Sequence, residues 1–135
     1  MARILIAEDD LTSRVLCYKM VEKLGHTPIA SPDGEHAYHT LTSNNNIDIL
    51  ITDIMMPNMD GRVLIHTLRG QSELASLPII IMSAVVGVDD IADLLKLGAD
   101  LFLPKPIDRN DLADYIERCL DINSKIKGWA SSDIN

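Results

Sequence analysis

Five short apolar runs alternate with five helix-like patterns along this 135-residue chain. Three of the runs are nearly continuous in Ile and Leu, which is typical of strands that are covered on both faces. Repeated strand–helix alternation predicts an α/β fold, a doubly wound five-stranded parallel sheet with helices on both faces. The expected strands are Ile4–Ala7, Thr27–Ala30, Ile47–Thr52, Ile79–Met82 and Leu101–Leu103.

The helix-like patterns place apolar residues three and four positions apart. In the first, Cys17 is followed at this spacing by Met20, Val21 and Leu24, and Gly25 is expected to be a left-handed cap. Asp108 is expected to cap the fifth helix. The other four helices are expected at about Gly34–Thr42, Arg62–Arg69, Asp89–Leu97 and Arg109–Ile122.

The second apolar run is the most suitable edge strand, because it is the poorest in apolar residues and contains Pro28. With right-handed crossovers, we therefore expect the strand order 2-1-3-4-5. Residues 1–123 are expected to form one domain. Ser124–Asn135 has no clear pattern, and we expect a frayed tail or the start of a linker there.

Composition narrows the class of protein. A formal net charge of −8 argues against a nucleic-acid surface. No apolar run approaches the ~20 residues that a membrane span requires, and no signal peptide precedes Ile4. Cys17 and Cys119 lie on the apolar sides of helical patterns and are expected to be reduced core thiols. We therefore expect a soluble cytoplasmic protein, without membrane insertion or direct nucleic-acid binding.

Polar residues follow four of the five apolar runs: Glu8 and Asp9, Asp53, Ser83 and Lys105. In open α/β sheets, ligands bind beyond the carboxyl ends of the strands, where the strand order reverses. The expected order brings the three carboxylates side by side, where they could bind Mg²⁺ while Lys105 pairs with Asp53. An ionised Asp53 could then attack phosphorus, with Ser83 donating a hydrogen bond to a phosphoryl oxygen.

Four ordered motifs resemble the receiver domain of bacterial two-component response regulators, including the single-domain receivers of chemotaxis. The resemblance covers about residues 3–122 and implies a flavodoxin-like sheet. The motifs are ILIAEDD (4–10), DILITDIMMPNMDG (48–61), PIIIMSA (78–84) and LGADLFLPKP (97–106).

The resemblance implies a role for each site residue. Asp53 matches the phosphoacceptor, and Mg²⁺, or Mn²⁺ in its place, would be bound by Asp53, by the acidic pair of Glu8 and Asp9, and by the Met55 backbone carbonyl. Lys105 matches the lysine of the family's site. Ser83 matches the switch hydroxyl, and Phe102 matches the switch aromatic.

The resemblance also implies partners. A sensor histidine kinase or a histidine phosphotransfer protein would donate the phosphoryl group, and small phosphodonors could replace it. Phosphorylation would change the face formed by the fourth helix, the fifth strand and the fifth helix, which would bind an unknown downstream protein and could also support a dimer. We expect a phosphoacceptor that promotes its own phosphorylation, not an enzyme. We expect slow dephosphorylation, because Met55 and Val85 cannot orient a water molecule.

Four alternatives remain open. A phosphatase with an aspartate nucleophile would need a second acid where Met55 stands, and a nucleotide-binding protein would need glycine-rich phosphate loops that are missing. An inert pseudo-receiver would be expected to lack part of the set of polar residues. The chain could also be the N-terminal fragment of a longer regulator. His36 and His39 are expected to be exposed side chains without a metal.

Overall fold

The structure is a computed structural model that describes residues 1–43, 46–84 and 87–132, with side chains as far as residue 121. Five parallel strands form one sheet in the order β2-β1-β3-β4-β5, which confirms the predicted fold class and strand order. The strands are β1 (Arg3–Ala7), β2 (Thr27–Ser31), β3 (Ile49–Thr52), β4 (Ile79–Ser83) and β5 (Leu101–Pro104).

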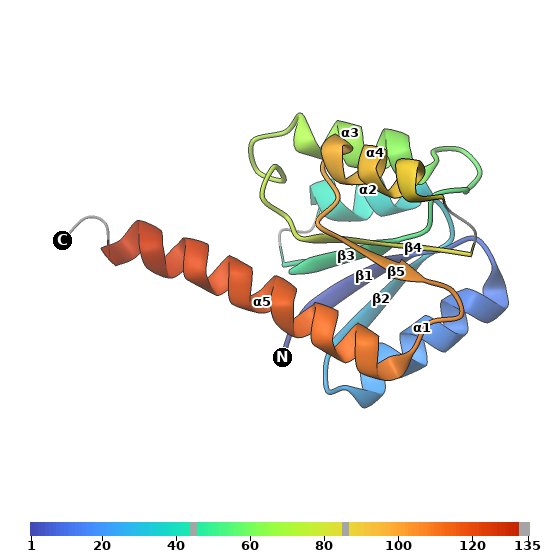
Figure 1. The fold of residues 1–135 in the computed structure, drawn as a ribbon, viewed down its shortest axis with the longest axis horizontal. Helices are drawn as coiled ribbons and strands as arrows, with labels where there is room; N and C mark the ends of the chain where they lie inside the picture. Colours follow the sequence, from blue (N-terminus) through green and yellow to red (C-terminus); the bar gives the residue numbers. More distant parts are fainter. Residues whose placement is uncertain (44–45, 85–86, 133–135) are drawn as a thin grey trace.

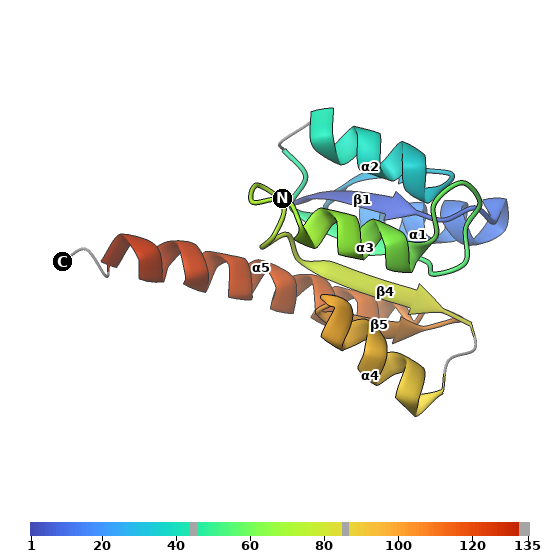
Figure 2. The same cartoon turned by 90° about the horizontal axis from the view of Figure 1, so that it is seen from above.

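The helices lie on both faces of the sheet, with α2, α3 and α4 on one side and α1 and α5 on the other (Figure 1). Figure 2 shows the same layers from above. The helices are α1 (Leu11–Lys23), α2 (Gly34–Ser43), α3 (Gly61–Arg69), α4 (Val88–Leu97) and α5 (Arg109–Ser132).

The core explains why the apolar runs are continuous. Leu5 and Ala7 of β1 pack into the cluster that α2, α3 and α4 cover, whereas Ile4 and Ile6 pack with α1 and α5. Successive side chains of a strand point to opposite faces, so a strand that is covered on both sides must be apolar at every position. All the apolar residues of β1 and β3 are fully buried.

Two smaller predictions are confirmed by local geometry. Gly25 has a φ of 90° after the end of α1, and the Asp108 side chain accepts hydrogen bonds from the backbone N–H groups of Asn110 and Asp111 at 2.7 and 3.1 Å. Cys17 and Cys119 are free and buried, and burial raises the pKa of both thiols to about 12. No helix in the described part of the chain is both long and apolar enough to span a bilayer.

The predicted end of the fifth helix was wrong. Helix α5 continues past Ile122 to Ser132, so residues 124–132 are helical and not irregular. The segment 123–132 contains no proline, so every residue in it can donate a helical backbone hydrogen bond. Residues 133–135 lie outside the described part, and the domain boundary at residue 123 remains a prediction.

Candidate functional site

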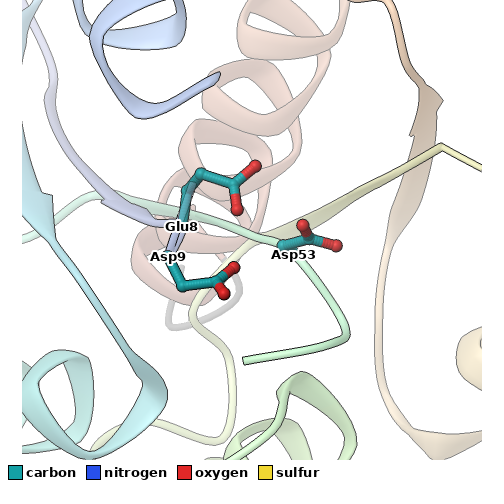
Figure 3. Close-up of side chains that lie close together, drawn as sticks. All are labelled: Glu8, Asp9 and Asp53. Carbon is teal, nitrogen blue, oxygen red and sulfur yellow. The ribbon is translucent and has the colours of Figure 1, made fainter. Parts of the chain in front are cut away.

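Three carboxylates meet at the carboxyl ends of β1 and β3 (Figure 3). Ala7 pairs with Thr52 in the parallel register of these strands, so Glu8 and Asp53 leave the sheet at the same level. The backbone N–H of Asp53 donates to the Ala7 carbonyl at 2.9 Å and fixes this alignment. One ligand oxygen from each of Glu8, Asp9 and Asp53 lies within 4.8 Å of the others.

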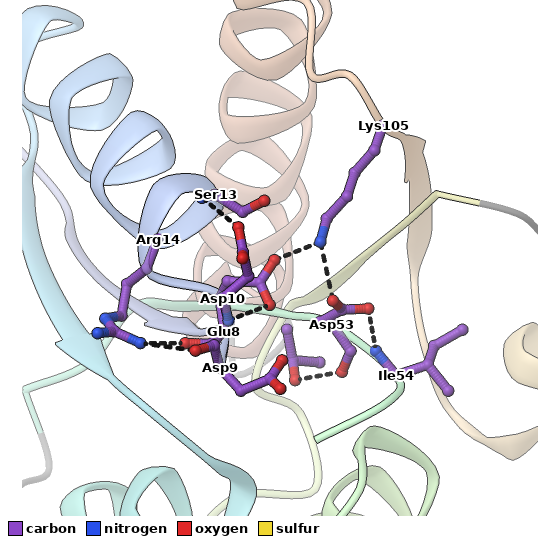
Figure 4. Close-up of polar contacts among 9 residues, drawn as sticks. Glu8, Asp9, Asp10, Ser13, Arg14, Asp53, Ile54 and Lys105 are labelled. Atoms are coloured by element: carbon purple, nitrogen blue, oxygen red, sulfur yellow. Dashed lines mark hydrogen bonds and ion pairs between the residues drawn. The ribbon is translucent and has the colours of Figure 1, made fainter. Parts of the chain in front are cut away.

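The ammonium group of Lys105 provides a positive charge beside the three carboxylates. Its Nζ donates to Asp53 Oδ2 at 2.8 Å and also to Glu8 Oε1, which confirms the predicted pairing with Asp53 (Figure 4). The Lys105 backbone N–H donates to the Ser83 carbonyl at 2.9 Å. The end of β4 therefore positions the lysine directly across from the carboxylates.

Burial and neighbouring charges shift the pKa values of Glu8 and Lys105. Glu8 is 0% exposed, and its burial, together with the nearby charge of Asp53, raises its pKa to about 7 although Lys105 acts in the opposite direction. Burial would lower the pKa of Lys105, but its hydrogen bonds to Asp53 and Glu8 outweigh that effect and raise it. One ammonium group thus only partly compensates three close carboxylates.

The turn after β3 holds Asp53 in place. The Ile54 backbone N–H donates to Asp53 Oδ1 at 2.6 Å. Asp60 caps α3, because its Oδ1 accepts from the Val63 backbone N–H at 2.9 Å. A Cβ at Gly61 would lie 2.3 Å from the Asp53 carbonyl oxygen, so only glycine fits where α3 begins. Asp60 and Gly61 therefore allow α3 to begin in close contact with the backbone of Asp53, the candidate phosphoacceptor.

The loop after β1 is held by contacts that the sequence did not reveal. Asp10 is the N-cap of α1 and accepts from the Ser13 backbone N–H at 2.9 Å, which also lowers the pKa of its carboxyl. Arg14 Nη1 donates to the backbone carbonyls of Glu8 and Asp9 at 2.8 and 3.3 Å (Figure 4). The sequence did offer one hint of the Arg14 contact. Arg14 lies near the start of a predicted helix, where the helix dipole disfavours a positive charge unless another contact compensates it.

The remaining predicted residues lie around this centre. Asp9, Met55 and Ser83 line one cleft of about 620 Å³, although Asp53 and Lys105 are not among its lining residues. Met55 is 81% exposed. Phe102 is partly buried, packs against the core cluster, and pairs in register with Ile81, two residues before Ser83. Val85 lies outside the described residues, and the roles assigned to this group stay predictions.

The donor set suits a hard divalent cation. Glu8, Asp9 and Asp53 offer only carboxylate oxygens, which Mg²⁺ and Mn²⁺ prefer over softer ligands. In the described part of the chain, no hydrogen bond or ion pair reaches the Asp9 carboxylate, so its oxygens remain available. The residues therefore fit a metal site, and the identity of the metal is a separate question.

The two histidines of α2 lie elsewhere. His36 Nδ1 is 2.7 Å from Ser31 Oγ, and His39 Nε2 is 3.9 Å from a carboxylate oxygen of Glu35. Both side chains are exposed, as expected. Neither belongs to the cluster of carboxylates.

Comparison with known proteins agrees with this geometry. The gliding motility regulatory protein of Myxococcus xanthus is 35% identical over 103 residues, which are 76% of this chain but only 13% of that much longer protein. A chemotaxis protein CheY homolog of Campylobacter jejuni is 28% identical over 123 residues, 90% of this chain and 95% of that protein.

A solved structure is similar over nearly its whole length. It is the receiver domain of a sensor histidine kinase from Pseudomonas aeruginosa, with a magnesium ion coordinated in its active site cleft. It is 25% identical with a TM-score of 0.82, and the match covers 89% of this chain and 98% of that one. The family model of the response regulator receiver domain matches residues 4–117. The chain therefore belongs to the response regulator receiver domain family.

Proposed function

We propose that this protein is a phosphoacceptor of a two-component phosphorelay, and that Asp53 receives the phosphoryl group. The observation that carries the proposal is the joint placement of Asp53, the acidic pair Glu8 and Asp9, and Lys105 at the carboxyl edge of the sheet. Phosphoryl transfer depends mainly on positioning and charge neutralisation. This set of side chains can provide both.

The proposed metal is Mg²⁺, with Mn²⁺ able to replace it. Glu8, Asp9, Asp53 and the Met55 backbone carbonyl would hold it. The fully oxygen-based donor set supports this choice, and so does the magnesium in the cleft of the similar Pseudomonas aeruginosa receiver domain. When bound, the cation would neutralise negative charge on the carboxylates and on the incoming phosphoryl oxygens.

The proposed step is an in-line displacement at phosphorus. A carboxylate oxygen of Asp53 forms the new bond to phosphorus, while the bond from phosphorus to the donor's imidazole nitrogen breaks and its electron pair leaves with the donor. With a small acyl phosphate, the bond to the carboxylate oxygen of the leaving group breaks instead. Lys105 stabilises charge on the phosphoryl group, and Ser83 donates a hydrogen bond to it. The product is an acyl phosphate on Asp53.

The proposed donor is a sensor histidine kinase or a histidine phosphotransfer protein. Exposed apolar residues of α1 near the site support a protein donor, since Leu11 is 64% and Leu16 46% exposed. Leu16 also lines a smaller cleft of about 310 Å³ together with Lys105 and Ile107. A donor that docks at this cleft could present its phosphohistidine to Asp53.

The proposed output is a change at the face formed by α4, β5 and α5, coupled to Asp53 through Ser83 and Phe102. That face would select an unknown downstream protein and could form a dimer. Val88 and Leu95 of α4 are exposed apolar residues that suit such contacts. The two free buried cysteines support a reducing, cytoplasmic location.

The experiment is incubation with acetyl phosphate and Mg²⁺, followed by intact-mass measurement. We expect one added phosphoryl group on the wild type and none on Asp53→Asn, because the amide is nearly isosteric but is not a nucleophile. Asp114→Asn, which changes an exposed acid on α5, is the matched control and should be phosphorylated normally. The decay of the added mass after removal of the donor tests the proposed slow hydrolysis, which a lifetime of a few seconds would contradict.

The same experiment, together with an assay of phosphate-ester hydrolysis, separates the alternatives. An inert pseudo-receiver would gain no mass under any condition. Phosphorylation of Asp53→Asn would place the nucleophile at another residue. Turnover of phosphate esters by the wild type would favour the phosphatase. An output domain in a longer regulator would leave all these results unchanged.

A further inference from the structure

The guanidinium of Arg14 lies behind the acidic pair, on the side away from Lys105 (Figure 4). Its Nη1 donates to the Glu8 carbonyl at 2.8 Å and to the Asp9 carbonyl at 3.3 Å. The two acceptors belong to consecutive residues of the loop between β1 and α1. A single side chain thus fixes two successive peptide units of the segment that carries the acidic pair.

The contact cannot be explained as an ordinary helix contact. Arg14 lies in the first turn of α1, where the dipole of the helix disfavours a cation. In the described part of the chain it also forms no ion pair with a carboxylate, although three carboxylates lie close by. A guanidinium that bonds to carbonyl oxygens leaves the carboxylate oxygens of Asp9 free for another ligand.

We propose that Arg14 is a positioning residue for the divalent cation, because it holds the Glu8–Asp9 loop in the conformation that directs both carboxylates at the metal site. This inference rests on the proposed function, which requires the cation. Arg14 acts through the backbone and not as a ligand. Its loss should therefore weaken metal binding without blocking the transfer step once the metal is bound.

The sign of the effect distinguishes positioning from simple electrostatics. Removing a positive charge close to a cation site lowers the repulsion on the incoming Mg²⁺ and should tighten its binding. Loss of positioning should weaken binding instead. Groups that orient metal ligands typically contribute about 10-fold to 100-fold in metal affinity. The two explanations thus predict opposite changes in the dissociation constant.

The experiment is calorimetric titration of Mg²⁺ into Arg14→Met, which keeps the apolar stem of the side chain but has no donor. We expect the dissociation constant to rise about tenfold. Arg14→Lys retains a donor for one carbonyl, so its dissociation constant for Mg²⁺ should lie between those of Arg14→Met and the wild type. The matched control is Arg118→Met, since Arg118 forms an exposed pair with Asp114 on α5, and it should bind Mg²⁺ like the wild type.

Two further measurements exclude a general structural defect. Urea unfolding without metal should show that Arg14→Met is folded under the titration conditions. At saturating Mg²⁺ its rate of phosphorylation by acetyl phosphate should stay within about twofold of the wild type, because only the ground-state affinity for the metal has changed.

The outcomes also separate this inference from the proposed function. An unchanged or lower dissociation constant for folded Arg14→Met overturns the positioning role. Weaker Mg²⁺ binding by Arg14→Lys than by Arg14→Met overturns it as well. Failure of the wild type to bind Mg²⁺ would instead overturn the proposed function itself.

Discussion

Glu8 shows how a single residue links the site to stability. Its side chain is fully buried and accepts a hydrogen bond from Lys105, which also pairs with Asp53. The pKa of Glu8 rises from an ordinary 4.5 to about 7, mainly because burial disfavours the charged form. Between these values the folded protein holds a proton that the unfolded chain releases. The contribution of Glu8 to stability is therefore present below pH 4.5 and is lost as the pH rises through about 7.

We expect Glu8→Gln, which imitates the protonated acid, to gain stability relative to the wild type as the pH rises from 5 to 7.5 in metal-free buffer. The full shift corresponds to on the order of 3 kcal/mol. Urea unfolding at several pH values measures the difference in the free energy of unfolding. Glu35→Gln, at an exposed position on α2, is the control. A Glu8→Gln difference that does not depend on pH would contradict the expectation.

The meeting of residues that directly follow strands was predictable from the sequence, whereas the contacts within the loops were not. Glu8, Asp53 and Lys105 follow apolar runs, so the parallel sheet itself brings them together. Arg14 binds backbone carbonyls, whose direction depends on the conformation of a short loop. No residue pattern records that conformation. The proposed switch role of Phe102 likewise depends on a second conformation of the molecule, which no residue pattern in the sequence describes.

At the element scale, the order of the elements followed from periodicity, and their ends followed from local chemistry. The caps at Asp108 and Gly25 were readable because each has a fixed backbone requirement. The Asp60-Gly61 pair was visible only as the end of one motif. The close approach of α3 to the Asp53 carbonyl is a contact between two elements and needed the assembled fold.

We expect Gly61→Ala to destabilise the protein by about 2 kcal/mol, within the range for overpacking a rigid position. The new Cβ would lie 2.3 Å from the Asp53 carbonyl oxygen and 2.9 Å from the Ile54 Cα, so α3 must move away from the site. We also expect weaker Mg²⁺ binding, because Met55 lies in the displaced turn.

Urea unfolding and calorimetry measure the two effects of Gly61→Ala. The control is Gly70→Ala at the other end of α3, where the new Cβ would be 3.5 Å from the nearest atom, the Thr67 carbonyl oxygen. It should be neutral or slightly stabilising. Equal effects of the two substitutions would show that the contact with Asp53 does not matter.

At the scale of the whole molecule, the core and the end of the chain follow different rules. In the part of α5 whose side chains the structure describes, as far as residue 121, Leu112, Ile116 and Cys119 are buried in the core and Leu120 packs against it. Figures 1 and 2 both show the later turns of α5 leading away from the sheet. Helix periodicity therefore predicted the part of α5 that packs on the sheet, whereas the turns after Ile122 showed no apolar pattern in the sequence.

We expect a chain that ends at residue 123 to keep its fold and its site. Its free energy of unfolding should lie within about 0.5 kcal/mol of the full chain, as for changes remote from a core. Its Mg²⁺ affinity should be unchanged, while the far-UV circular dichroism should lose the helical signal of residues 124–132. A chain that ends at residue 115 is the control, because it also loses the buried Ile116 and Cys119 and should not fold stably. A loss of several kcal/mol on cutting at residue 123 would instead mean that the final turns of α5 belong to the domain.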